Sequence, residues 1–243
     1  MDSQKMIDDI CDYIYNEDPE NLDITSKVNE FIKLFPEEKD KMWQLLYCIY
    51  EANLADEEDK LKIVIHHLSD EELLNVLKSN YYINDKGRPE GEESEPIVWV
   101  TEAFISRSAD SQMKLVDYLL ECHKPREDRH LPDTDQGITH ALFDVLFKFS
   151  PEAVLRAVKQ GVEMGFYSDF GGVGYEYLKA GNKKYEKELV ACFLKGWSVD
   201  PEFSFFYGLI SECILSKDAL DFLDEQIDKM GIREEFQEYT GIA

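Results

Sequence analysis

The sequence contains little that is typical of exported or membrane-embedded proteins. No apolar run approaches the roughly 18 residues that a transmembrane helix requires. The first ten residues, MDSQKMIDDI, are acidic and polar, whereas a secretory signal begins with basic residues and continues with apolar ones. These absences predict a protein that is neither exported nor membrane-bound, and so a cytoplasmic one.

Cysteine is scarce, and its spacing shows no pairing. The chain has five cysteines, an odd number, and none of them forms a Cys-x-x-Cys pair. Most fall within apolar helical patterns, so we expect reduced thiols in the core rather than a disulfide framework. The five are Cys11, Cys48, Cys122, Cys192 and Cys213.

Positive charge is scarce as well. The chain has 26 lysines and arginines against 51 aspartates and glutamates, which gives a net charge of −25. Both ends are acidic, and residues 101–200 are nearly neutral. A negative field repels phosphate backbones and anionic membranes and attracts cations. We therefore expect no nucleic acid and no membrane as partners, but a basic protein. A carboxylate surface that only keeps the chain soluble is the alternative.

The composition is that of a globular protein. Hydrophobic residues make up 44% of the 243 residues, and aromatic residues make up 12%. A chain of this length buries about 70% of its surface on folding, which is enough for one sizeable core or two small ones.

Almost every ordered segment has the apolar spacing of a helix rather than of a strand. An apolar face near the start is formed by Met6, Ile7, Ile10, Cys11 and Ile14. A second helix is expected from about Thr25 to Phe35, with Val28, Phe31, Ile32 and Phe35 facing inward. The best strand candidate, PIVWVTEAF at 96–104, can equally be a helix that begins near Val98.

Capping residues indicate where further helices begin. Two tripeptides combine a cap, a first-turn proline and a first-turn acid: Ser150-Pro151-Glu152 and Asp200-Pro201-Glu202. The other expected starts are Pro36 within a first turn, Ser69 with Glu72 as a capping box, Ser111, and Ser216 before the last long helix.

The two Pro-Glu starts predict a repeat. A shift of 50 positions pairs Phe143 with Phe193 and Pro151 with Pro201, without a gap over about a dozen positions. A unit of two helices and a turn is similar to the HEAT-type hairpin, whose period is somewhat shorter. The fold class is therefore predicted to be all-α, as an irregular stack of helical hairpins (HEAT-like) or as an orthogonal helix bundle.

One polar segment interrupts the helical patterns. Residues 84–96, NDKGRPEGEESEP, combine glycine, proline and acids, as flexible linkers do. We expect an N-terminal acidic helical lobe at 1–83, a flexible acidic loop or linker at 84–96, and a C-terminal helical lobe at 97–243 that holds the repeat of about 50 residues. Together they are expected to form one compact unit.

The segment YSDFGGVGYEYLKAGNKKYEKELV, residues 167–190, contains a possible catalytic motif. Asp169-Phe170-Gly171 matches the magnesium-binding tripeptide of protein kinases, but the other kinase motifs are absent. A phosphate-binding P-loop needs Gly-Lys-Ser/Thr after a strand, which is also absent. We interpret Gly171, Gly172 and Gly174 as a hinge between two helices, the first ending near Gly165. A functional loop is the alternative, since a hinge needs only one glycine.

Possible metal ligands gather in ECHKPREDRHLPDTDQGITH, residues 121–140. The spacing fits neither a zinc site nor a calcium loop, so we expect no metal and no other cofactor. A metal-dependent enzyme that uses the His123–His140 loop is the alternative function. The competent ligands are Cys122, His123, His130, Asp133, Asp135 and His140.

Acidic residues line one side of the last long helix. Asp221, Asp224, Glu225 and Asp228 recur at i, i+3, i+4 and i+7, opposite Leu220, Leu223 and Ile227. Only Lys217 and Lys229 are near enough in sequence to offset them. A second acidic cluster is Asp56, Glu57, Glu58 and Asp59, and the candidate aromatic anchors are Tyr81, Tyr82 and Trp99.

These patterns predict a non-enzymatic, acidic protein-binding module that docks a basic protein. An immunity or inhibitor-type antagonist of a cationic toxin or nuclease would have such a surface. Besides the metal-dependent enzyme, a helical scaffold that associates with itself through apolar hairpin edges is an alternative.

Overall fold

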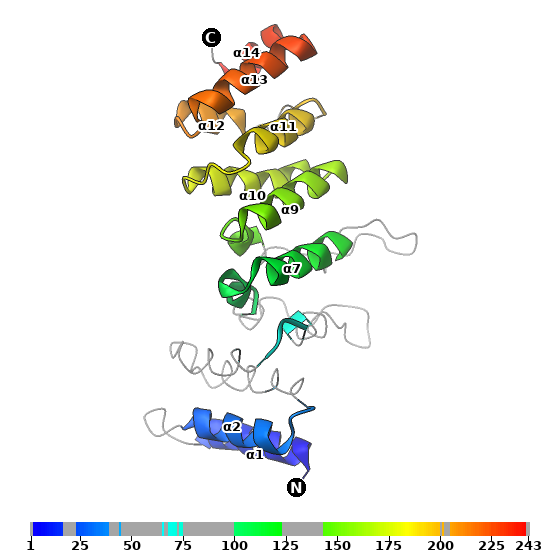
Figure 1. Cartoon of the computed structure of the whole chain (residues 1–243), viewed down its shortest axis with the longest axis vertical. Helices are drawn as coiled ribbons and strands as arrows, with labels where there is room; N and C mark the ends of the chain where they lie inside the picture. The colour runs from blue at the N-terminus through cyan, green and yellow to red at the C-terminus, as the bar shows by residue number, and fades with distance from the viewer. Residues whose placement is uncertain are drawn as a thin grey trace. The chain divides into compact units, whose positions relative to one another are not determined.

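The computed structural model describes residues 2–16, 23–38, 44, 65, 68–71, 73–74, 100–122, 143–199, 201 and 205–241. Every regular element in these ranges is helical, which confirms the all-α class (Figure 1). The elements are α1 (Ser3–Asn16), α2 (Ile24–Leu34), the 3-10 helix η3 (Phe104–Ser106), α7 (Ala109–Cys122), α9 (Pro151–Glu163), α10 (Tyr167–Lys179), α11 (Glu186–Trp197), α12 (Phe206–Ser211), α13 (Lys217–Met230) and α14 (Arg233–Thr240).

The contacts divide the chain into two units. One comprises Met1–Ala103 with Asp133–Ile138, and the other comprises Phe104–Pro132 with Thr139–Ala243. The predicted linker at 84–96 lies outside the described residues, so the predicted domain boundaries stay predictions. Within the described part of the chain, no helix has the length and apolar character needed to cross a membrane.

In the first unit, α1 packs against α2. Met6, Ile7, Ile10 and Ile14 are buried, as their spacing predicts. On α2, Val28 and Phe31 are fully buried, whereas Ile32 and Phe35 are only half-buried. Asp23 caps α2 by accepting a hydrogen bond from the Ser26 amide, at 3.0 Å. The amphipathic pattern therefore located both helices.

Two expectations for the first unit are wrong. Pro36 does not open a helix: Pro36 and Glu37 form a turn in which the Glu38 amide donates to the Phe35 carbonyl, at 3.1 Å. Cys11 is disulfide-bonded rather than reduced. Since disulfides are rare in a reducing compartment, this bond removes one argument for a cytoplasmic location, which stays a prediction.

The second unit is built from α7 and α9 to α14, which follow one another in chain order in Figure 1. Helix α9 packs against α7, α10 and α11, while α11 also packs against α10 and α13, and α13 against α14. Residues 100–103, at the end of the strand candidate, are helical. The choice between a hairpin stack and an orthogonal bundle stays a prediction, as does the repeat.

The three glycines near position 172 do not form a hinge, because they lie inside α10. The chain reverses earlier, at Gly165, where φ is +95°. A Cβ on Gly171 would lie 2.5 Å from the ring of Phe205, and one on Gly174 would lie 3.0 Å from that of Phe193. These two glycines therefore let aromatic rings approach the helix closely, which explains two of the three.

Some of the predicted helix starts are confirmed and others are wrong. Ser216 caps α13 as expected, and its Oγ accepts from the Ala219 amide at 3.2 Å. Ser150 and Pro151 open α9, but α7 begins before Ser111, after Ser108. The second Pro-Glu start is wrong: Pro201 lies in a 3-10 turn, and the following α-helix begins only at Phe206. The helix expected after Ser69 is present at residues 70–71 and 73–74.

A buried carboxylate joins α11 to α13. The Glu186 side chain is 7% exposed. Its Oε1 accepts from the Ser216 amide at 2.9 Å and from Lys183 Nζ at 3.1 Å, while Oε2 accepts from Ser216 Oγ. Burial alone would raise the pKa of Glu186, but the Ser216 hydrogen bonds and Lys183 outweigh burial and hold the pKa below its usual value.

A pair of glycine substitutions tests the role of close helix packing. A Cβ on Gly161 would lie 2.0 Å from the fully buried Phe170 ring, so Gly161→Ala is expected to lower the free energy of unfolding by about 1–3 kcal/mol. Gly172 has open space, so Gly172→Ala is expected to raise it by about 0.5–1 kcal/mol. Urea denaturation followed by circular dichroism measures both. Equal effects would contradict the packing role.

The Glu186 joint makes stability depend on pH. Glu186→Gln is expected to lower the free energy of unfolding at pH 7 by about 1–2 kcal/mol. Because the folded pKa lies below the usual 4.5, the stabilisation is fully present above pH 4.5 and is lost as the pH falls through the folded value. The difference between wild type and variant should therefore shrink in acid. Exposed Glu188→Gln is the control, and a constant difference down to pH 2 would contradict the joint.

Candidate functional site

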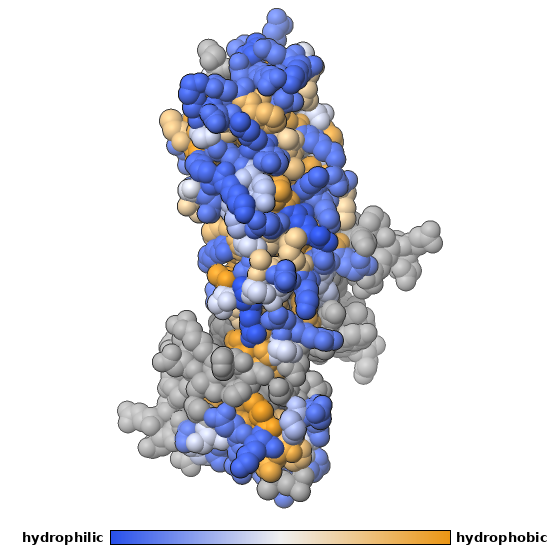
Figure 2. All heavy atoms as spheres, viewed as in Figure 1, coloured by the Kyte–Doolittle hydropathy of each residue, from blue (hydrophilic) through white to orange (hydrophobic). Residues whose placement is uncertain are grey.

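The most acidic described surface is the pair of helices α13 and α14. Residues 217–240 carry eight acidic and three basic side chains. Gly231, with φ +68°, ends α13 and lets the chain turn directly into α14. Figure 2 shows mainly hydrophilic residues at this end of the second unit, with some apolar residues visible between them.

The acidic stripe lies on α13 as its spacing requires. We use this name for Asp221, Asp224, Glu225 and Asp228, all of which are exposed. On the opposite side, Leu223 and Ile227 are buried at 3% and 4% exposure, but Leu220 is 37% exposed. The sequence pattern places Leu220 opposite the stripe together with these two residues, but its side chain reaches the surface.

Each carboxylate of the stripe is paired with a cation of the same chain. Lys217 binds Asp221 and Lys229 binds Glu225, each at 2.6 Å. Arg233 binds both remaining members of the stripe. The sequence pattern identified the two lysines but missed Arg233, because this residue belongs to the next helix.

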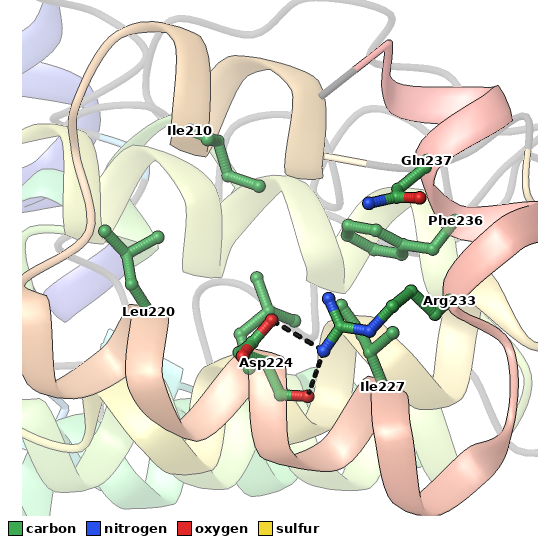
Figure 3. Close-up of a pocket in the computed structure, with 8 residues that line it drawn as sticks. Ile210, Leu220, Asp224, Ile227, Arg233, Phe236 and Gln237 are labelled. Atoms are coloured by element: carbon green, nitrogen blue, oxygen red, sulfur yellow. Dashed lines mark hydrogen bonds and ion pairs between the residues drawn. The ribbon is translucent and has the colours of Figure 1, made fainter. Parts of the chain in front are cut away.

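Arg233 bridges α14 to α13 (Figure 3). Its Nη2 lies 2.8 Å from Asp224 Oδ1, as Figure 3 shows. Its Nε lies 2.6 Å from Asp228 Oδ1. Nη2 also donates to the Asp224 carbonyl at 3.4 Å. The hydrogen bond from Arg233 lowers the pKa of Asp228, and the two carboxylates raise that of Arg233. Asp224 and Asp228 of the stripe therefore already bind the guanidinium group of Arg233.

Beside this bridge lies a cavity of about 180 Å³, which we call the C-terminal pocket. It lies between α12, α13 and α14, and Figure 3 shows its side chains converging from the three helices. Its floor is apolar, while three polar side chains stand at its edge. It is lined by Ile210, Leu220, Leu223, Asp224, Ile227, Arg233, Phe236 and Gln237.

Aromatic packing fixes α14 in this position. The Phe236 ring lies 5.6 Å from that of Trp197 and 5.2 Å from that of Phe206, measured between centroids. Thr240 Oγ1 donates to the Phe236 carbonyl at 2.7 Å within the same helix. The pocket is therefore preformed: one wall is a helix held by buried rings and by an exposed ion-pair bridge.

Three exposed acids of α13 and α14 form no ion pair with a described residue. Glu234 and Glu238 each follow a residue that lines the pocket, and their i, i+4 spacing places them on one side of α14. Both are exposed, as is Asp218 on α13, and none of the three forms an ion pair with a described residue. The free negative charge of this surface therefore lies beside the stripe rather than on it.

The other residues selected from the sequence lie outside the described part of the chain. These are Asp56, Glu57, Glu58, Asp59, Tyr81, Tyr82, Trp99 and the His123–His140 loop. Among the described residues, no group of three or more histidines, cysteines or acids could hold a metal ion.

A second cavity, of about 320 Å³, lies between α9 and α11 and contains Cys192. Burial raises the pKa of the Cys192 thiol, and the nearby Lys159 only partly offsets it. The thiol therefore stays protonated at neutral pH, the form in which cysteine is a weak nucleophile. The charged residues that line this cavity are two lysines and two glutamates, so their charges favour neither an acidic nor a basic ligand. They are Lys159, Lys195, Glu163 and Glu188.

Comparison with known proteins adds no relative: no family model matches the chain, and neither does any curated protein or solved structure.

Replacing the bridging arginine should change the titration of its partners. In Arg233→Ala, the pKa of Asp228 is expected to rise towards its ordinary value of 3.8, because its strongest hydrogen bond is lost. Carboxyl NMR titration of the full chain measures this. Lys229→Ala is the control, because this lysine pairs with Glu225 and should leave the pKa of Asp228 low. An unchanged pKa in Arg233→Ala would show that the bridge does not form in solution.

Proposed function

We propose that this chain is a non-enzymatic protein-binding module that docks a basic protein on its acidic helical surface, with α13 and α14 as the contact region. The observation that carries the proposal is the coincidence of two features there. The free carboxylates and a preformed apolar pocket occupy the same pair of helices. Protein interfaces combine an apolar centre with a polar rim in this way.

The negative charge of the chain favours association with a positively charged protein over association with a neutral or negatively charged one. A net charge of −25 draws a basic partner in over about one Debye length, roughly 10 Å at 0.1 M salt. Such steering acts mainly on the association rate, and the fit at the contact sets how long the complex lasts. An antagonist of a cationic toxin or nuclease is one member of this class.

The ion pairs of the acidic stripe indicate which acids are free to contact a partner first. Exposed ion pairs are weak and exchangeable, so the lysines on Asp221 and Glu225 can give way to the cations of a partner. The Arg233 bridge is different, because it also holds α14 in place. We therefore assign initial contact to Asp218, Glu234 and Glu238, none of which forms an ion pair with a described residue.

A charge-neutralising variant tests this function. The triple variant Asp218→Asn, Glu234→Gln and Glu238→Gln is compared with Asp169→Asn, Glu163→Gln and Glu188→Gln, which removes the same charge from α9, α10 and α11. Tagged full-length chains are incubated with native lysate at about 0.05 M and about 0.5 M salt, which shortens the Debye length about threefold. Retained proteins are identified by mass spectrometry.

At low salt, the wild type and the control variant are expected to retain basic proteins, and the triple variant is expected to retain none. At high salt, no chain is expected to retain them. Retention of the same proteins by the triple variant, or of proteins without excess positive charge, would contradict docking at α13 and α14. Light scattering of the purified chain checks the alternative of self-association, which predicts an oligomer.

A further inference from the structure

The C-terminal pocket has the size of one side chain rather than of a small molecule. Sites for small organic ligands usually enclose about 300–1,000 Å³, and this pocket encloses about 180 Å³. Its floor is formed by Leu223, Ile227 and Phe236, which are at most 5% exposed. No polar group rises from this floor, so an occupant gains by burying apolar surface and has no buried hydrogen bond to make.

The edge of the pocket has the opposite character. Asp224, Arg233 and Gln237 stand at the edge, and Arg233 forms an ion pair with Asp224 while it also pairs with Asp228. The same two helices expose Glu234 and Glu238, which have no ion pair with a described residue, and Asp221 of the stripe, which binds Lys217. A ligand whose apolar group enters the pocket therefore docks on a pair of helices whose residues 217–240 carry eight acidic side chains against three basic ones, with Asp224 at the pocket itself.

We propose that the C-terminal pocket binds one aliphatic side chain, of the size of leucine or methionine, from a basic amphipathic segment of another protein. Lysines and arginines that flank the aliphatic residue contact the exposed carboxylates of α13 and α14, among them Glu234 and Glu238. This inference rests on the proposed function, and it names the part of the partner that the site recognises.

The charge pattern selects this occupant over others of similar shape. An acidic or neutral segment could fill the apolar floor, but it would be repelled by the free carboxylates or would leave them uncompensated. Leu220, which is 37% exposed, stands at the pocket wall and can cover the aliphatic side chain once it has entered. Excluding water there strengthens the ion pairs at the edge, since charges interact more strongly at low dielectric.

Synthetic peptides separate the apolar contribution from the charged one. The probe is a helix-forming peptide of about 14 residues, about four turns, with one leucine flanked by lysines and arginines. A second peptide carries alanine in place of the leucine, and a third carries glutamine in place of the bases. Fluorescence anisotropy gives the Kd of each for the full chain. The leucine peptide is expected to bind about tenfold more tightly than the alanine peptide.

Two protein variants locate the binding. Leu220→Asn makes the pocket wall polar at nearly the same volume, and it is expected to abolish the preference for leucine over alanine. Met230→Gln is the matched control, since Met230 is 43% exposed on the same helix but does not line the pocket. Gln237→Leu should increase the preference, so the inference stays testable even if Leu220→Asn folds poorly.

The outcomes distinguish this inference from the proposed function. Equal, salt-sensitive binding of the leucine and alanine peptides would overturn the anchor and leave docking by charge intact. Absence of binding by the leucine peptide would also overturn the anchor, and the lysate experiment would then decide the proposed function separately. A leucine preference that survives Leu220→Asn would place the anchor elsewhere on the chain.

Discussion

The packing of Phe236 against Trp197 and Phe206 is the interaction on which the C-terminal surface depends. It fixes α14 across α13, and it leaves a preformed cavity between α12, α13 and α14. Rings are well suited to this task because they bury a large area with few rotatable bonds. The Arg233 bridge adds direction to this packing, since two carboxylates in a line hold a guanidinium in one orientation.

Close approach of helices is the second constraint, and glycine provides it. At Gly161, Gly171 and Gly174 the space that a Cβ would occupy is taken by an aromatic ring. The contacts extend from α9 through α10 to the segment before α12, so the packing of rings on small residues continues along the second unit. The α13–α14 surface is therefore built on a rigid support, which would lower the entropic cost of the binding proposed at the pocket.

Much of the fold follows from local patterns, whereas the site does not. Amphipathic spacing located α1 and α2, and Ser216 marked the start of α13, because caps and helix faces involve residues within a few positions. Asp200-Pro201-Glu202 failed although its letters resemble those at Ser150. The hinge predicted at the glycines of α10 is wrong, because glycine occurs both at hinges and at close helix contacts. The rings that make these contacts belong to residues far away in sequence, so local spacing does not reveal them. Arg233 and the inward turn of Phe236 depend on how α14 packs, which no spacing within one helix records.

The ion pairs within the acidic stripe reduce the negative charge that its sequence pattern suggests. In the sequence, Asp221, Asp224, Glu225 and Asp228 form the strongest negative feature of the last long helix. In the folded chain these four acids meet three cations, so their net contribution to the local field is small. The field comes instead from acids that have no such partner among the described residues. Glu234 and Glu238 are two of them, and they lie on a helix whose sequence offered no stripe. Under the proposed function, an acidic pattern matters for docking only where the fold leaves it without an ion pair, and among the described residues Glu234 and Glu238 of α14 meet this condition.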